Sequence, residues 1–140
     1  MHHQSVPDGY RLLDRKSAFS DLTGPYYMKA KKGPIVKLGL RIEAQHLNKV
    51  GVAHGGALMT LADNAIGDAV IQAYDHPVSA VTVTMNTEFM NPAVLGDWVE
   101  AEAQILKKGG RLLFASCIVS VQDKRIMHAS GVMALVKTPV

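Results

Sequence analysis

Five segments of the chain carry the hydrophobic pattern of β-strands. Residues 36–44, 79–90 and 97–108 alternate apolar and polar positions, which predicts strands with one buried and one exposed face. Residues 111–122 and 125–137 are apolar on both faces, which predicts strands in the middle of a sheet. Short turn sequences rich in Gly, Asn and Asp separate the last four segments and favour antiparallel hairpins between them.

The strand expected at residues 79–90 has two different faces. Its apolar face would hold Val81, Val83, Met85 and Phe89. Its polar face would hold Thr82, Thr84, Asn86 and Glu88. Strict alternation therefore predicts that Thr82 and Met85 point to opposite sides of the sheet.

One long helix is expected between the first strand and the other four. It runs from about Gly55 to Tyr74, and its polar residues recur every four positions to form one stripe, Thr60, Asn64, Asp68 and Gln72. Residues 17–28 have the pattern of a short helix broken at Gly24-Pro25. One long helix and about five strands predict an α+β domain in which the helix lies on an antiparallel sheet.

Length and composition agree with a single globular domain over residues 1–140, with residues 1–16 as an extended or weakly ordered N-terminal segment. The net charge of +3 is mild, and no recognition helix or zinc-ligand spacing is present, so we expect no nucleic-acid partner. No apolar run reaches the ~20 residues that span a bilayer, so we expect no membrane partner. The first residues lack the apolar core of a signal peptide, and the presence of a single cysteine favours a cytoplasmic protein.

The single cysteine, Cys117, excludes a disulfide within the chain and lies in an apolar run, where it is expected to be a small buried hydrophobe. His46, His76 and His128 show no metal-ligand spacing with a carboxylate, so we expect no metal site.

The start of the long helix carries the first candidate chemistry. Residues His54, Gly55 and Gly56 stand where backbone N–H groups of a helix are unpaired and carry partial positive charge. Glycines let a ligand approach these amides, which suits an oxygen that becomes negative during acyl transfer. The alternative is a glycine-rich turn that only connects the preceding segment to the helix.

Asp63 is the second candidate, because it lies at the edge of an otherwise apolar helix face. It follows Gly55 by eight residues, so the two stand ~12 Å apart along a continuous helix. One small carbonyl group cannot contact both. Either Asp63 is unrelated to the Gly55 amide, or a second copy of the chain supplies the carboxylate across a two-fold axis.

Two stretches, LNKVGVAHGGALMTLADNA (47–65) and TVTMNTEFMNPAVLGDWVEAEAQILKKGGR (82–111), resemble the hotdog-fold acyl-CoA thioesterases. The specific parts of the match are Asn48 six residues before His54, the His-Gly-Gly sequence, Asp63, and Pro-x-x-x-Gly-Asp at 92–97. The branch with the phenylacetate-pathway (PaaI-like) thioesterases and thioesterase-superfamily member 13 is the most similar. The resemblance covers roughly residues 35–137.

The resemblance implies a hotdog fold, in which a long central helix is wrapped by an antiparallel sheet of five to six strands. It implies that dimers form one continuous sheet, that two dimers form a tetramer, and that each site spans the dimer interface. It further implies hydrolysis of an acyl-CoA thioester without a cofactor, since CoA is part of the substrate.

By position, the resemblance gives the Gly55 N–H the role of polarising the thioester carbonyl. Asn48 and His54 would place the substrate or the attacking water, and Asp63 of the partner chain would act as general base or nucleophile. Thr82 stands where some relatives have a serine that positions the water. Each has a simpler alternative: Asn48 as a turn residue, His54 as a helix-entry residue, and Thr82 as a polar-face residue.

Substrate binding is assigned to two groups of residues. Gly56 and Asn64 adjoin the catalytic positions, and the turn with Lys107, Lys108, Gly110 and Arg111 would receive the CoA phosphates. A second basic group, formed by Lys29, Lys31 and Lys32, is expected to be a solvated loop.

The sequence leaves the acyl group open among phenylacetyl, hydroxybenzoyl and fatty acyl groups, and it leaves CoA open against acyl carrier protein. The alternative function is a non-catalytic acyl-CoA binding or sensing hotdog domain, which would keep the pocket without needing Asp63.

Overall fold

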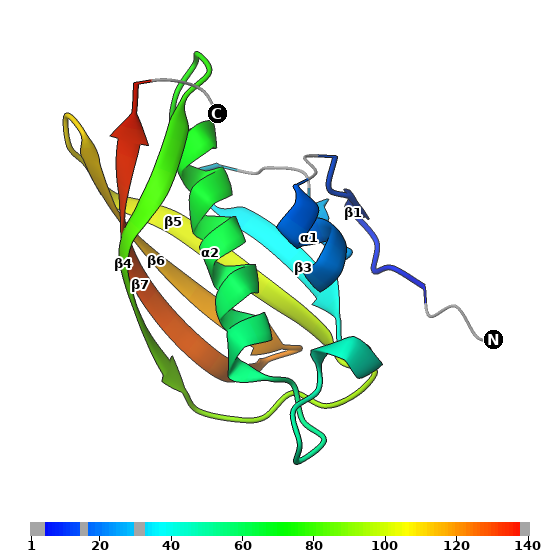
Figure 1. Ribbon diagram of the computed structural model, residues 1–140. Helices are drawn as coiled ribbons and strands as arrows, with labels where there is room; N and C mark the ends of the chain where they lie inside the picture. Colours follow the sequence, from blue (N-terminus) through cyan, green and yellow to red (C-terminus); the bar gives the residue numbers. More distant parts are fainter. Residues whose placement is uncertain (1–4, 15–16, 30–32, 138–140) are drawn as a thin grey trace.

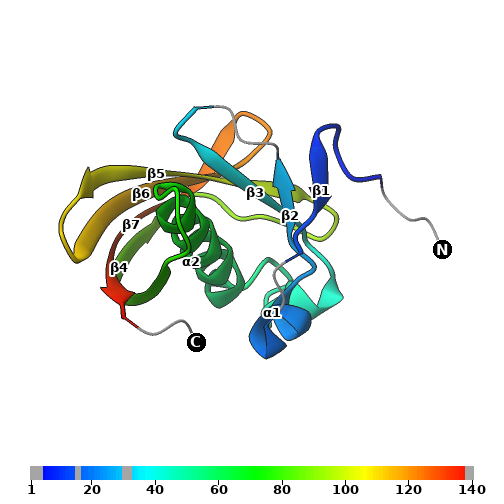
Figure 2. The same cartoon turned by 90° about the horizontal axis from the view of Figure 1, so that it is seen from above.

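The computed structural model describes residues 5–14, 17–29 and 33–137. A long helix, α2, lies across one face of a curved, seven-stranded antiparallel sheet with the strand order β1-β2-β3-β5-β6-β7-β4 (Figure 1). Viewed from above, the sheet bends around the helix (Figure 2). The elements are β1 (Tyr10–Leu12), α1 (Ala18–Thr23), β2 (Tyr27–Lys29), β3 (Val36–Arg41), the 3₁₀ turn η1 (Ala44–His46), α2 (Gly55–Gln72), β4 (Ser79–Phe89), β5 (Trp98–Lys108), β6 (Leu112–Val121) and β7 (Lys124–Val136).

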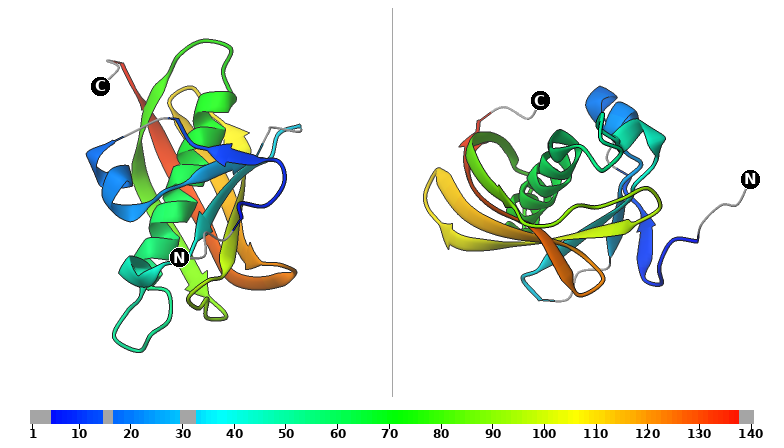
Figure 3. Two further views of the ribbon diagram at one scale, coloured as in Figure 1. Left: turned by 90° about the vertical axis from the view of Figure 1, so that its right-hand side faces the viewer. Right: turned by 90° about the horizontal axis from the view of Figure 1, so that it is seen from below.

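This architecture confirms the expected α+β hotdog fold, but the sheet has seven strands instead of five or six. The additional strands, β1 and β2, have three residues each, and β2 pairs with β1 and with β3. Three residues are too few to show the alternation by which longer strands are predicted. They extend the sheet at the edge opposite β4 (Figure 3).

The described residues of the N-terminal region include regular elements. The short helix expected within residues 17–28 is α1, whose N-cap Ser17 accepts a hydrogen bond from the Ser20 N–H (3.0 Å). Within the segment 1–16, β1 is a regular strand, while residues 1–4 and 15–16 lie outside the described residues. Lys31 and Lys32 of the first basic group also lie outside the described residues.

The prediction of a hairpin between residues 79–90 and 97–108 is wrong. β4 pairs with β7, and β5 pairs with β3 and β6. Residues 90–97 instead cross the end of the sheet beneath the start of α2, where the Ala53 N–H donates to the Ala93 carbonyl (2.8 Å). Turn residues indicate that the chain reverses direction, but they do not show which strand it joins next. The connection formed by residues 90–97 is long enough to pass the two strands that lie between β4 and β5. The other two hairpins, β5–β6 and β6–β7, are formed as expected.

The edge strand β4 contains a bulge that changes which residues face the helix. Its register shifts between Thr82 and Thr84, so Thr82 pairs with Met133 and Met85 pairs with Gly131. The extra residue places Thr82 and Met85 on the same, helix-facing side, and the strict alternation expected for residues 79–90 is therefore wrong. The bulge brings the Thr82 hydroxyl to α2 while Met85 still packs against the core.

The core lies between α2 and the inner face of the sheet. Leu58, Leu61 and Ile66 of the helix are at most 3% exposed. Cys117 on β6 is 1% exposed, and burial raises the pKa of its thiol to about 12. The thiol therefore stays protonated at neutral pH, in agreement with the expected role as a small hydrophobe.

Candidate active site

The N-terminus of α2 presents an unpaired backbone donor. His54 is the N-cap, and its ring Nδ1 accepts the Gly56 N–H (2.8 Å). The His54 carbonyl accepts the N–H groups of Ala57 and Leu58 (2.9 and 3.2 Å). Within the described part of the chain, no group accepts the Gly55 N–H. The helix start therefore leaves the Gly55 amide available to a ligand, while His54 holds the amide of Gly56.

The approach to Gly55 is bordered by Phe89, at the end of β4. A Cβ atom added to Gly55 would lie 3.2 Å from the Phe89 Cζ, so the ring packs against the glycine backbone. Phe89 is 49% exposed, which is unusual for a phenylalanine. From the sequence, Phe89 is predicted only to be an apolar strand residue, because nothing in the local pattern shows that β4 ends beside the start of α2.

Asn48 shapes the loop that leads into α2. Its side-chain Oδ1 accepts the N–H groups of Val50 and Val52 (3.0 and 3.2 Å). Its own N–H donates to the Val52 carbonyl (2.8 Å), which closes the turn. Asn48 thus closes this turn through its Oδ1, and no described residue accepts a hydrogen bond from its side-chain NH₂.

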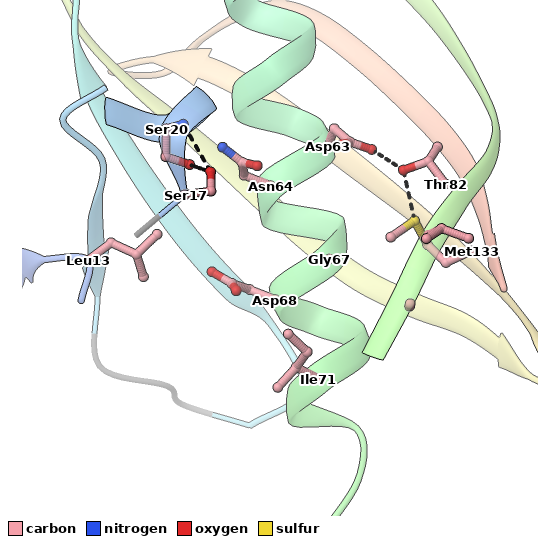
Figure 4. A pocket seen from close by; sticks show the side chains of 12 residues that line it. Leu13, Ser17, Ser20, Asp63, Asn64, Gly67, Asp68, Ile71, Thr82 and Met133 are labelled. Carbon is pink, nitrogen blue, oxygen red and sulfur yellow. Dashed lines mark hydrogen bonds between the residues drawn. The ribbon is translucent and has the colours of Figure 1, made fainter. Parts of the chain in front are cut away.

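Asp63 and Thr82 meet beside the middle of α2. The Thr82 hydroxyl lies 2.6 Å from Asp63 Oδ1 and 3.3 Å from the Met133 sulfur (Figure 4). A hydroxyl has one proton, and a carboxylate is a far stronger acceptor than a thioether, so the proton goes to Asp63. This hydrogen bond orients the carboxylate and leaves its second oxygen for another partner.

Gly55 and Asp63 remain apart within one chain. Both lie on α2, which is continuous from Gly55 to Gln72. Eight residues of helix correspond to a separation of roughly 12 Å along the axis. Within one chain, the Gly55 N–H and the Asp63 carboxylate are therefore too far apart to act on the same carbonyl group. A shared site requires a second chain that supplies one of the two groups.

An open groove of about 430 Å³ lies over α2 and reaches both sides of the helix. Its lining consists of Leu13, Ser17, Ser20, Asp63, Asn64, Gly67, Asp68, Ile71, Ala80, Val81, Thr82 and Met133. Figure 4 shows the Asp63–Thr82 pair on one side of the helix, and Asn64 directed towards α1 on the other. The groove therefore connects the candidate base with a second polar region.

Several residues of this groove are absent from the sequence prediction. Leu13, Ser17 and Ser20 come from the N-terminal region, and no local pattern marks them as neighbours of α2. Asp68 belongs to the polar stripe of the helix but is only 3% exposed. The sequence signal that could have placed Asp68 in the groove was its position four residues after Asn64, because residues at this spacing share a helix face.

The basic turn between β5 and β6 lies at the opposite end of α2 from Gly55. The Lys108 ammonium donates to the Ala73 carbonyl (3.1 Å) and lies 3.8 Å from the centre of the Tyr74 ring. Lys108 thus stabilises the C-terminal end of the helix, where a cation is favourable. Lys107 and Arg111 are exposed on the same turn, with Gly110 between them.

The described residues contain no group of three or more His, Cys, Asp or Glu side chains arranged to hold a metal ion. Among the helices of the described segments, none is both long and apolar enough to cross a membrane.

Comparisons with known proteins bear on this geometry. The sequence profile of the thioesterase superfamily matches residues 50–128, which include Gly55, Asp63 and Thr82. A Pseudomonas aeruginosa protein described as an esterase, PA0474, is 37% identical over 131 residues, covering 94% of this chain and 98% of its own. Acyl-coenzyme A thioesterase 13 of Mus musculus is 39% identical over 92 residues, covering 66% of this chain and 65% of its own.

Among solved structures, the PaaI protein from the phenylacetic acid degradation operon of E. coli superimposes with a TM-score of 0.77. The match covers 86% of this chain and 85% of PaaI at 22% identity, so it shows a common fold. These findings confirm the resemblance stated from the sequence motifs. On both sequence and fold, the chain belongs to the thioesterase superfamily.

Proposed function

We propose that the protein hydrolyses acyl-CoA thioesters to a free carboxylic acid and CoA. The observation that carries this proposal is the unpaired Gly55 N–H at the start of an 18-residue helix that also bears the Thr82-bound carboxylate of Asp63. A helix-terminal amide stabilises an oxyanion, and an oriented carboxylate activates water. The similarity to acyl-coenzyme A thioesterase 13 supports a CoA thioester as the substrate.

In the proposed reaction, Asp63 accepts a proton from a water molecule, and the oxygen of that water attacks the thioester carbonyl carbon. The carbonyl oxygen becomes negative and is held by the Gly55 N–H. Collapse of this intermediate breaks the C–S bond, and the CoA thiolate takes up a proton. His54 immediately precedes Gly55, Asn48 lies in the loop that leads into α2, and both are assigned to placing the carbonyl in this proposal. Direct attack by Asp63 on the carbonyl carbon is the alternative; it would release the CoA thiolate and form a mixed anhydride. Attack of water on the Asp63 carboxyl carbon of this anhydride would release the free acid and leave solvent ¹⁸O in the Asp63 side chain.

The proposed site combines Gly55 of one protomer with Asp63 of another. Antiparallel pairing of two α2 helices across a two-fold axis brings each carboxylate to the partner's helix start. The exposed apolar side chains of β4 support pairing at this edge, since Val81 and Val83 are 50% and 57% exposed. β4 strands of two protomers would then join into one continuous sheet, and two such dimers would form the tetramer.

This pairing also suggests how CoA binds. In a site formed by Gly55 of one protomer and Asp63 of its partner, the C-terminal end of the partner's α2 lies roughly 15 Å beyond that Asp63 and the Gly55 beside it. The turn carrying Lys107, Gly110 and Arg111 sits at this end, where its charges can meet the CoA phosphates. Lys108 holds the turn against the helix through its contact with the Ala73 carbonyl. Gly56 and Asn64 line the path of the bound thioester and its acyl group.

Gly55→Pro tests the proposed oxyanion donor. Proline removes the N–H, yet it is favoured at the first position of a helix, and the extended backbone of His54 (φ −64°, ψ 135°) is compatible with a following proline. We expect kcat to fall about 10²- to 10³-fold. Gly55→Ala is the control for the added bulk beside Phe89, because it keeps the N–H. Equal activity of the two variants would show that the amide does not contribute.

The Thr82–Asp63 hydrogen bond is tested by a pair of substitutions at Thr82. Thr82→Val keeps the shape of the side chain and removes the donor, so kcat should fall about 10- to 100-fold, as expected for a hydrogen bond to a charged group. Thr82→Ser keeps the hydroxyl and should retain most of the activity. Turnover with a common acyl-CoA substrate measures both, and an unaffected Thr82→Val enzyme would leave the hydroxyl with a packing role only.

The hydrolase and the non-catalytic binding domain are distinguished by thiol release. Incubation with a panel of aromatic and aliphatic acyl-CoAs should produce free CoA, measured with a thiol reagent. Tight binding of acyl-CoA without thiol release from any member of the panel would support the binding domain instead.

A further inference from the structure

His46 is a buried histidine that the proposed hydrolysis does not use. It is the last residue of η1 and is 3% exposed. Both ring nitrogens contact backbone groups. Nδ1 accepts the Glu43 N–H (2.9 Å), and Nε2 lies 2.7 Å from the Thr23 carbonyl oxygen. Because Nδ1 is an acceptor, the single proton of the ring is on Nε2 and is donated to Thr23. The ring therefore connects two segments that are 23 residues apart in the chain.

The two ring contacts hold different parts of the structure. The bond from Glu43 to Nδ1 closes the η1 turn together with the bond from the His46 N–H to the Glu43 carbonyl (3.0 Å). These two bonds fix the orientation of the His46 backbone. The contact with Thr23 satisfies a carbonyl at the end of α1, where the helix itself supplies no donor. Since α1 has no buried residue of its own, the ring attaches α1 to the turn.

The backbone of His46 leads directly to the start of α2. Its carbonyl accepts the His54 N–H (2.7 Å), and the bridge between Leu47 and Ala53 pairs the chain on either side of the intervening loop. His54 is the N-cap of α2 and is joined to Gly55 by a single peptide unit. The direction of the Gly55 N–H therefore depends on where the His46 carbonyl holds His54.

We propose that His46 is a positioning residue for hydrolysis, which acts through the Gly55 N–H. Its Nδ1 fixes the η1 turn, the His46 carbonyl holds the helix start, and the Gly55 amide is thereby directed at the thioester carbonyl oxygen. This inference rests on the proposed function, because the direction of the amide matters only for a bound thioester. The negative charge on that oxygen develops in the transition state, so a misdirected amide lowers kcat more than it changes KM.

Two amide substitutions separate the contacts of the two ring nitrogens. The side-chain nitrogen of Gln is as many bonds from Cβ as the ring Nε2, so His46→Gln keeps a donor for Thr23 but places no acceptor at the position of Nδ1. The Oδ1 of Asn is as many bonds from Cβ as Nδ1, so His46→Asn keeps the acceptor for Glu43 but does not reach Thr23.

We expect His46→Gln to lower kcat about tenfold with KM changed by less than about twofold, since a displacement of 1 Å at a reacting centre costs up to about 10²-fold. His46→Asn should keep kcat within about twofold of the wild type. The matched control is His128→Gln, because the His128 side chain is 39% exposed on β7 and should leave kcat and KM unchanged. Thiol release from an acyl-CoA measures all three.

A double-mutant cycle with Gly55→Pro shows whether His46 acts through the amide. Proline lacks the N–H, so in this background His46→Gln has no amide left to misdirect and should lower kcat by less than about twofold. A general effect of His46 on packing would instead lower kcat about tenfold in both backgrounds.

The outcomes separate this inference from the proposed function. Wild-type kcat in His46→Gln, or the same tenfold loss with and without the Gly55 N–H, would overturn the positioning role and leave the hydrolase intact. If His46→Gln does not fold, His46→Asn decides: retained kcat supports the role of the acceptor, and a tenfold loss overturns it. Equal activity of Gly55→Pro and Gly55→Ala, or no thiol release from any acyl-CoA, would instead contradict the proposed function itself.

Discussion

Replacing Asp63 by Asn is expected to lower kcat for acyl-CoA hydrolysis by about 10²- to 10⁴-fold, the usual contribution of a positioned general base. The amide oxygen of Asn can still accept the Thr82 hydroxyl, which lies 2.6 Å from Oδ1. The fold should therefore be retained, but an amide cannot take a proton from water. Thiol release measures the loss of activity, and urea unfolding measures whether the free energy of unfolding stays near that of the wild type.

Asp123→Asn provides the matched control, because Asp123 is exposed in the turn between β6 and β7. The same change of charge there should leave turnover unaffected. Wild-type activity in Asp63→Asn would exclude this carboxylate as the base.

Mixing two inactive variants should restore activity if the site is shared between protomers. In a hybrid of Asp63→Asn and Gly55→Pro protomers, one site combines an intact Gly55 with an intact Asp63, and the other site carries both substitutions. Random reassociation of equal amounts makes half of the dimers hybrids, so about a quarter of the wild-type activity should return. The roughly 12 Å between Gly55 and Asp63 on one helix is the physical reason for this expectation.

Complementation requires exchange of protomers, so the two variants are unfolded together in urea and refolded before thiol release is measured. The Asp63→Asn protein alone, unfolded and refolded in the same way, should stay inactive. Hybrids that form, as shown by mass, but show no more activity than the separate variants would mean that each site lies within one protomer.

The long helix shows which features can be predicted from the local sequence pattern. Its start at Gly55 follows from two glycines after a capping residue, and the observed helix begins there. The free amide of Gly55 follows from the same local chemistry, because the first N–H groups of any helix lack partners within it. The distance to Asp63 also follows from helix geometry alone.

The pairing of strands could not be predicted in the same way. The turn residues after Phe89 suggest a hairpin, yet β4 pairs with β7 and residues 90–97 cross beneath the start of α2. The bulge after Thr82 is equally invisible in the alternation of residues 79–90. Both depend on which distant segment a strand meets, and a pattern of alternating side chains contains no information about its neighbour.

By itself, the sequence of this protein determined the type of each long element and the amide at the start of α2, since these depend on neighbours within one or two helical turns. It also singled out Asp63 as the candidate base, through the resemblance of its motifs to a known family. Only the tertiary structure decided that Thr82 faces Asp63, that Phe89 borders Gly55, and that the N-terminal region forms a wall of the groove beside Asp68. These contacts join residues up to about fifty positions apart in the chain. They form because burying apolar surface brings such segments together, and that force is non-directional and has no local signature.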